Sequence, residues 1–532
     1  MNDEINSTNI NNGRNRSYDL GLIIAGVGIQ VILVILMVIE PDATLNGIQS
    51  IFDRVIEVFG PLMLWFTLIT FGIAIYLGFG KYGNIKLGEG NPEYSMFSYI
   101  SMMTLASLAS AAIYWSFTEW ASYYSGPGLD MEASSFLALD TSLSYAFFHW
   151  GIGMQSLYVI IGIAIAFAVY IKKVPLFQVS TVCNAMLGDR VEEKKKKTFG
   201  KIIDFIVIIG IVGGLGSTLG LAVPLAGGGL TQAAGIELTF SVKVGILLTI
   251  AIVFTITSFI GTKKGMQTVS NTSTIICLAL LAYLFIMGPT VFIMDNITNS
   301  LGWMVTNFMR MSLFTDPIAG GKFPDWWTIY FIAFYLNYTA FMGIFIAKIS
   351  KGRTIRQVTW ATLLGIRCGV WVLFGVNGSF AIHANMEGFV DVVGLVNKGA
   401  GQDAIYQLYE MLPGGTKIIP IVVMVMIVGF VASSLDTASL SLAQTTTLKL
   451  DENGDPSKWL RVFWCFILTL LPLSIMFVEA NFNVIKMISI LTAIPFVFIL
   501  IFMYVGTFRW LKEYKAEQCT IEDDVNINVD IV

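Results

Sequence analysis

Long apolar stretches alternate with short polar loops along most of this chain. Each stretch has roughly the 20 residues needed to cross about 30 Å of bilayer hydrocarbon. Because hydrocarbon offers no water to backbone groups, such stretches must be helical. The pattern predicts an all-α integral membrane protein with twelve transmembrane helices at 19–40, 60–79, 96–120, 142–171, 203–225, 242–262, 273–294, 326–348, 357–380, 417–447, 459–479 and 484–508.

Lysines and arginines are distributed unevenly between the loops. If the N-terminus and every second loop share one side, that side holds 24 of the 32 basic residues and the other holds seven. The remaining one, Arg367, falls inside a span. Positive charge marks the cytoplasmic side of a membrane protein. We therefore expect a multi-pass protein of the plasma membrane with both termini in the cytoplasm.

The composition excludes most other classes of protein. Charged residues make up only 13% of the chain and hydrophobic residues 55%, whereas soluble domains carry about twice that charged fraction. With five cysteines, two histidines and no paired metal-ligand spacing, we expect no disulfide, no metal centre and no cofactor. The sequence contains no catalytic motif, no ring of pore charges and no nucleic-acid-binding pattern, so a transporter is favoured over an enzyme, a channel or a receptor.

Small residues gather inside two of the predicted spans. Ala106 to Ala112 contains mostly alanine and serine, and Gly210 to Gly220 contains five glycines. Transporters use interrupted helices near the bilayer midplane to offer backbone groups to ions and substrates. Close packing between helices is the alternative interpretation.

Aromatic residues recur at helical spacing in two other spans. Such faces attract cations and form cages for quaternary ammonium groups. Rings in membrane proteins also gather at the lipid interface, which is the expected place of Trp326 and Trp327. The deeper candidates on one helical face are Trp150, Met154 and Tyr158 in one span, and Phe334, Tyr338 and Phe341, with Tyr335 and Met342 alongside, in another.

Four segments resemble the betaine/choline/carnitine transporter (BCCT) family. They are "FHWG" at 148–151, "STLGLAVPL" at 217–225, "FTDPIAGGKFPDWWTIYF" at 314–331 and "ISKGRTIRQ" at 349–357. The resemblance runs from about residue 18 to 510. It implies a core of two inverted five-helix repeats, spans three to seven and eight to twelve, preceded by two helices. Family members carry small zwitterionic or cationic amines, and many form homotrimers.

The resemblance also implies how the chain is organised. The predicted parts are a disordered cytoplasmic tail (1–18), two N-terminal helices (19–95), a first repeat (96–294), an extracellular linker with an amphipathic segment (295–325), a second repeat (326–510) and a cytoplasmic tail (511–532).

In sodium-coupled family members, two adjacent hydroxyl residues in span ten bind sodium against the loosened part of span three. The matching residues are Ser433 and Ser434. Sodium-independent exchangers carry an arginine in span seven, where this chain has Ser273, so sodium symport is favoured over exchange. A second sodium site matches Thr218 and Phe341, although Gly214 replaces its other threonine.

The family's substrate-binding residues match positions in spans three, four and eight. They are Ala111, Trp150, Gln155, Tyr158, Phe334, Tyr335, Tyr338 and Met342.

This set departs from the family at several positions. Betaine and carnitine carriers have tryptophan where this chain has Gln155, Phe334 and Tyr335, and choline carriers have an aspartate where it has Ala111. We therefore expect a zwitterion that brings its own carboxylate, of the glycine-betaine type. Gln155 offers an acceptor for an N–H, so a less methylated amine such as glycine, sarcosine or dimethylglycine is the alternative.

Overall fold

The computed structural model describes residues 18–108, 111–189, 191–260, 265–449, 455–478 and 482–529. All regular structure in these ranges is helical. The helices are α1 (Leu20–Ile39), α2 (Pro41–Phe79), α3 (Met96–Leu108), α4 (Ala111–Ser125), α5 (Phe136–His149), α6 (Ile152–Tyr170), α7 (Val179–Leu187), α8 (Glu193–Ala234), α9 (Phe240–Ile260), α10 (Gln267–Met287), α11 (Thr290–Leu313), η2 (Pro324–Thr328), α12 (Ile329–Ile349), α13 (Ile355–Trp360), η3 (Ala361–Gly365), α14 (Ile366–Met386), α15 (Val392–Asn397), α16 (Gly401–Glu410), α17 (Ile418–Thr446), α18 (Lys458–Val478) and α19 (Phe482–Val529).

A helix coincides with each apolar stretch found in the sequence. Within the described ranges, nine helical segments are long and apolar enough to cross a bilayer, or ten if the bent pair α3–α4 is one span. Helices α8 and α18 lie at two further predicted spans. The all-helical membrane fold is thus as predicted, while the total of twelve spans and the inverted repeat remain predictions.

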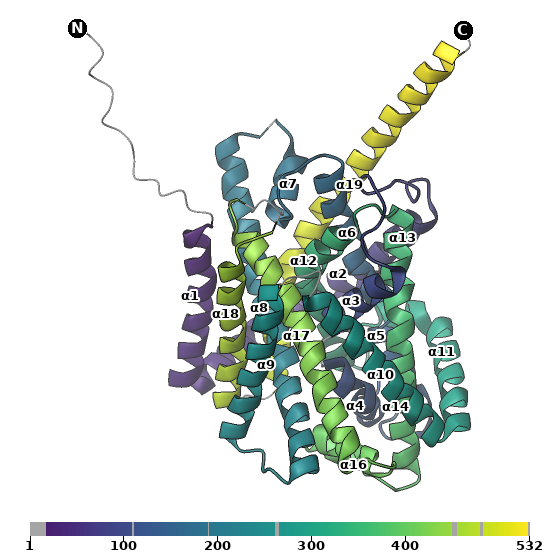
Figure 1. Cartoon of the computed structure of the whole chain (residues 1–532). Coiled ribbons are helices and arrows are strands. Elements are labelled where there is room, and N and C mark those ends of the chain that lie inside the picture. Colours follow the sequence, from purple (N-terminus) through teal and green to yellow (C-terminus); the bar gives the residue numbers. More distant parts are fainter. Residues whose placement is uncertain are drawn as a thin grey trace, which may run out of the picture.

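The loops assigned to one side by their basic residues meet at one end of the molecule, where α1 begins and α19 ends (Figure 1). Lys201 forms an ion pair with Asp19 at 2.9 Å, and Lys172 lies 3.8 Å from Glu513. The backbone N–H of Asp19 also donates to the carbonyl of Thr446 at the end of α17. This grouping agrees with the alternation predicted from the charges.

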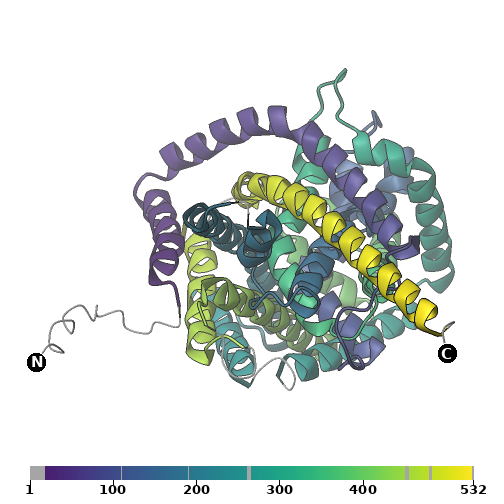
Figure 2. The ribbon, with the colours of Figure 1, turned by 90° about the horizontal axis from the view of Figure 1, so that it is seen from above.

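Helix α12 forms the interior of the bundle (Figure 1). All of its residues except Lys348 are buried, and α6, α8, α17 and α19 pack around it. By contrast, α1 and the first part of α2 lie at the edge in the view from above (Figure 2). The side chains of α12 therefore define the centre of the molecule.

Three predicted spans differ in detail from their helices. Span three is bent, because α3 and α4 are inclined by 63° across residues 109–110, which lie outside the described ranges. Span four, predicted as one helix over 142–171, is divided into α5 and α6. At the C-terminus, α19 continues to Val529, well beyond the predicted end of span twelve.

Span five is continuous, so the predicted interruption of this helix was wrong. Helix α8 runs through its glycines without a break. A Cβ at Gly210 would lie 2.3 Å from the Phe496 ring, and one at Gly214 would lie 2.9 Å from Cβ of Asn337. These glycines therefore allow α8 to approach α19 and α12 closely, which is the packing alternative.

Helices α6 and α12 approach each other through a pair of glycines. A Cβ at Gly343 would lie 2.7 Å from two carbons of Ile161, and one at Gly162 would lie 2.7 Å from Cγ2 of Ile346. Each glycine thus receives an isoleucine of the facing helix. This close contact fixes the spacing between the two helices that carry most of the predicted substrate residues.

Replacing Gly343 with valine should destabilise the protein, because the new methyl groups overlap Ile161. Overpacking of this kind costs about 1–3 kcal/mol, so the thermal unfolding midpoint of the purified protein should fall. Gly369→Val is the matched control, since a Cβ at this exposed glycine of α14 meets no atom within 4 Å. Equal midpoints for the two variants would contradict the packing described here.

Candidate functional site

The chain leaves the helical path at Trp150 and Gly151, between α5 and α6. Gly151 is extended, and a Cβ there would lie 2.6 Å from the Phe147 carbonyl oxygen. Glycine therefore permits a break that a larger residue would oppose. The break leaves the Trp150 carbonyl free of the α6 ladder, and it accepts a hydrogen bond from Nη1 of Arg367 at 2.7 Å.

Aromatic rings from the break and from α12 form one cluster. The Trp150 ring centroid lies 6.0 Å from that of Phe334 and 6.5 Å from that of Tyr335. Along α12, the ring of Tyr338 lies 4.4 Å from Phe334 and 4.7 Å from Phe341. The shared face predicted for these three α12 residues is confirmed.

Two rings from other helices also belong to this aromatic cluster. Tyr158 of α6 packs on Tyr335, with ring centroids 5.3 Å apart. Phe374 of α14 lies 5.1 Å from Trp150; its sequence surroundings gave no reason to single it out. All these side chains are buried. The rings contact one another directly.

Arg367 of α14 is the principal site residue that the sequence analysis did not assign. Its guanidinium is fully buried and donates to the Tyr335 hydroxyl at 2.8 Å and to the amide oxygen of Gln155, as well as to Trp150. An arginine inside an apolar span is by itself a sign of a functional site. That signal was present in the sequence, but no partner could be named for it.

This contact changes the role of Gln155. A guanidinium can only donate hydrogen bonds, so the amide oxygen of Gln155 must face Arg367. The acceptor expected to meet a substrate N–H is therefore already engaged. The amide nitrogen, by contrast, is buried and has no hydrogen-bond partner among the described residues.

A buried carboxylate supports the other side of Trp150. The indole Nε1 donates to Glu119 at 2.6 Å, and the Tyr123 hydroxyl also donates to this carboxylate. Tyr123 is in turn 2.7 Å from Nδ1 of His149. These contacts orient the Trp150 ring from α4.

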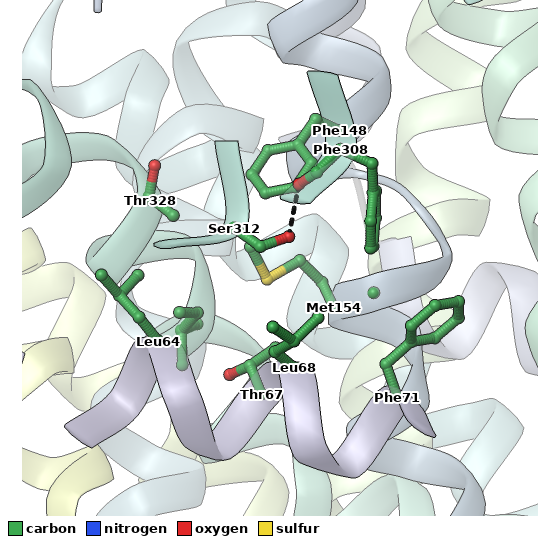
Figure 3. Close-up of a pocket in the computed structure, with 11 residues that line it drawn as sticks. Leu64, Thr67, Leu68, Phe71, Phe148, Met154, Phe308, Ser312 and Thr328 are labelled. Carbon is green, nitrogen blue, oxygen red and sulfur yellow. Dashed lines mark hydrogen bonds between the residues drawn. The ribbon is translucent and has the colours of Figure 1, made fainter. Parts of the chain in front are cut away.

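Met154 does not share the environment of Trp150 and Tyr158, although the three were predicted to lie on one face. The break removes Trp150 from the α6 register, and Met154 points into a small pocket between α2, α6 and α11 (Figure 3). This pocket of about 10 Å³ has room for about one water molecule. Ser312 and Phe308 of α11 line its far side.

The remaining substrate-site predictions are buried residues on the same elements. Met342 lies four residues beyond Tyr338 on α12, and Ala111 is the first residue of α4, just past the bend. Both side chains are at most 2% exposed.

The two predicted sodium-binding serines lie where α17 meets α3 and α10. The Ser434 hydroxyl donates to the carbonyl of Leu105 at 2.8 Å. Leu105 lies near the end of α3, four residues before residue 109. Ser433 shares a hydrogen bond of 2.9 Å with Ser270. Two adjacent residues of α17 thus contact a carbonyl oxygen of α3 and a hydroxyl of α10, and such hard oxygens are the type of ligand that sodium takes.

The second predicted sodium site is only partly visible. The side chain of Thr218 lies outside the described part of the structure. Phe341 is buried against Tyr338, and its backbone carbonyl accepts a hydrogen bond from Ser441 of α17 at 3.3 Å. This bond links the helix of the two serines directly to the helix of the aromatic cluster.

Known proteins are similar in sequence to this chain over most of its length. The uncharacterized transporter YeaV of Escherichia coli (strain K12) is 36% identical over 450 residues, which cover 85% of this chain and 92% of that protein. A carnitine transporter of Acinetobacter baumannii is 35% identical over 471 residues, covering 88% and 83% of the two chains.

A solved structure of a Na⁺-coupled sialic acid symporter is more distant. It matches with a TM-score of 0.45 and 14% identity over 83% of this chain and 86% of that chain, which is too weak to support an inference about sodium. The family described as "BCCT, betaine/carnitine/choline family transporter" matches residues 22–516. This chain therefore belongs to the betaine/carnitine/choline family of transporters.

Proposed function

We propose that this chain imports a small zwitterionic, N-methylated amine of the glycine-betaine type in symport with sodium. The aromatic cluster around Trp150 carries the proposal. Ring faces attract methylated ammonium groups, and the attraction grows when water is excluded. The relative from Acinetobacter baumannii is named a carnitine transporter, and carnitine carries both a trimethylammonium group and a carboxylate.

Sodium coupling is supported by the oxygens at the junction of α3 and α17. Ser434 and the Leu105 carbonyl are already in contact, so an ion bound by these oxygens would connect the two helices. Because Ser441 of α17 bonds to the backbone of α12, an ion bound at these serines acts on the helix that carries the rings. A coupling free energy between the ion and substrate sites would follow from this contact.

An exchanger would need a fixed cation near these serines instead. At the family's position for it this chain has Ser273, which packs against Gly429, one helical turn before Ser433. Ser273 supplies no charge at this position, so symport is favoured.

A less methylated amine is the second candidate substrate. Phe334 and Tyr335 give weaker cation–π contacts than tryptophan. The acceptor on Gln155 no longer supports this candidate, since Arg367 occupies it.

The arrangement in the membrane is part of the same proposal. Both termini lie in the cytoplasm of the cell, and two peripheral helices precede two inverted five-helix repeats. The grouping of the basic loops at one end supports this orientation. A homotrimer is proposed from the family resemblance alone.

Uptake of labelled amines into proteoliposomes tests this function. We expect accumulation of labelled glycine betaine under an inward sodium gradient. Unlabelled competitors should inhibit this uptake less and less in the order betaine, dimethylglycine, sarcosine and glycine. The reverse order would favour the second candidate. Uptake that is unchanged when sodium is replaced by potassium would exclude sodium symport.

Replacing both Ser433 and Ser434 with alanine should raise the sodium concentration needed for half-maximal uptake, because two oxygen ligands are removed. Thr445→Ala is the control, since this buried hydroxyl on α17 donates to its own helix. An identical sodium dependence in the double variant and the control would show that these serines serve only helix packing.

Trp150→Ala should weaken substrate binding by about 1–3 kcal/mol, which is a five- to hundredfold rise in Kd, because a desolvated cation–π contact is lost. Trp150→Phe keeps an aromatic face but loses the bond to Glu119, and it should retain most of the affinity. Equilibrium binding to the purified protein measures both. If alanine and wild type bind equally, Trp150 is a packing residue.

A further inference from the structure

Three buried donors near the aromatic cluster have no hydrogen-bond partner within the described structure. They are the amide nitrogen of Gln155, the hydroxyl of Tyr158 and Nε of Arg367. Gln155 and Tyr158 are three residues apart on α6 and thus neighbours on one helix face. Arg367 of α14 bonds to Gln155 and to Tyr335, on whose ring Tyr158 packs. The three groups therefore lie close to one another, where α6, α12 and α14 meet.

Arg367 brings a positive charge to this place, and no carboxylate of the described residues forms an ion pair with it. Arg367 donates only to neutral acceptors, namely an amide oxygen, a hydroxyl and a backbone carbonyl. Among the ion pairs of the described residues, none includes Arg367. A buried charge without a counter-ion is costly, and leaving buried donors unpaired adds to that cost. A ligand with a negative charge would relieve both costs at once.

The chemistry of the donors identifies the ligand group. A carboxylate accepts hydrogen bonds through two oxygens and donates none, and its bonds to a guanidinium are among the strongest in proteins. Nε of Arg367 and the amide nitrogen of Gln155 can only donate, so a cation or a ligand group that only donates would find no partner at these two atoms.

We propose that Arg367, Gln155 and Tyr158 form the subsite for the carboxylate of the transported zwitterion. This inference rests on the proposed function and specifies it further. The ammonium group then lies over the Trp150 ring, while the carboxylate lies towards α6 and α14.

The spacing of the two subsites fits a short zwitterion. Arg367 bonds to the backbone of Trp150 itself, and the Trp150 and Tyr335 ring centroids are 6.5 Å apart. The cation and anion subsites therefore adjoin each other, as the two ends of a short zwitterion require. Gln155 acts as a donor to the carboxylate in this arrangement, the opposite of the acceptor role expected from the sequence.

The test compares a ligand with and without its negative charge. The ligand is the tightest-binding compound of the series from glycine to glycine betaine, and its partner is the methyl ester of that same compound. The ester keeps the ammonium group but is no longer an anion. Affinities for both are measured on purified full-length protein by competition binding.

Three variants test the subsite: Tyr158→Phe, Gln155→Met and Arg367→Gln. Each should lower the affinity for the zwitterion about tenfold or more, while the affinity for the ester should change less than threefold. The ratio of the two affinities should fall most in Arg367→Gln. Tyr145→Phe is the matched control, because Tyr145 also carries a buried hydroxyl without a partner among the described residues, but on α5 outside the aromatic cluster. Its ratio should equal that of wild type.

Two outcomes would overturn the inference in distinguishable ways. If all three variants lower both affinities equally, or leave both unchanged, the three residues only support the fold and the proposed function stands. If wild-type protein binds no compound of the series, the proposed function fails and this subsite fails with it. Tyr158→Phe, which removes a single oxygen, keeps the test decisive even if Arg367→Gln does not fold.

Discussion

A polar group inside a bilayer must find its partners within the protein, and at the centre of this molecule that constraint falls on Arg367. Its guanidinium joins the backbone at the α5–α6 break, an amide on α6 and a hydroxyl on α12. These three bonds hold the parts of the aromatic cluster in fixed relation to one another. The glycine contacts between α6 and α12 keep the same helices close from the apolar side.

Much of this architecture follows from local patterns in the sequence. The apolar stretches place a helix at every predicted span, because hydrocarbon tolerates little else. The contact of Phe334, Tyr338 and Phe341 follows from helical periodicity alone, since residues three and four apart share a face. The adjacent hydroxyls of Ser433 and Ser434 could likewise be placed on α17 before the structure was known.

The features that the sequence did not reveal depend on contacts between distant segments. Arg367 and Gln155 are 212 positions apart in the sequence. No local pattern therefore indicates that the amide oxygen of Gln155 accepts a hydrogen bond from Arg367, or that its amide nitrogen has no partner among the described residues. The break at Trp150 and Gly151 interrupts an otherwise continuous apolar stretch, and it moves Met154 away from the cluster. The five glycines of α8, taken as a set, favoured a break over packing, and only the neighbouring Phe496 and Asn337 show that they serve packing.

The central claim is that the rings of Trp150 and α12 receive a zwitterion whose carboxylate faces Arg367. The most direct measurement is an experimental structure of the protein at high sodium with the tightest-binding amine of the betaine series. The account predicts ligand density between Trp150 and Tyr338, with the carboxylate within hydrogen-bond distance of Arg367 and Gln155. Density in the pocket beside Met154 (Figure 3), or a carboxylate directed away from Arg367, would contradict it.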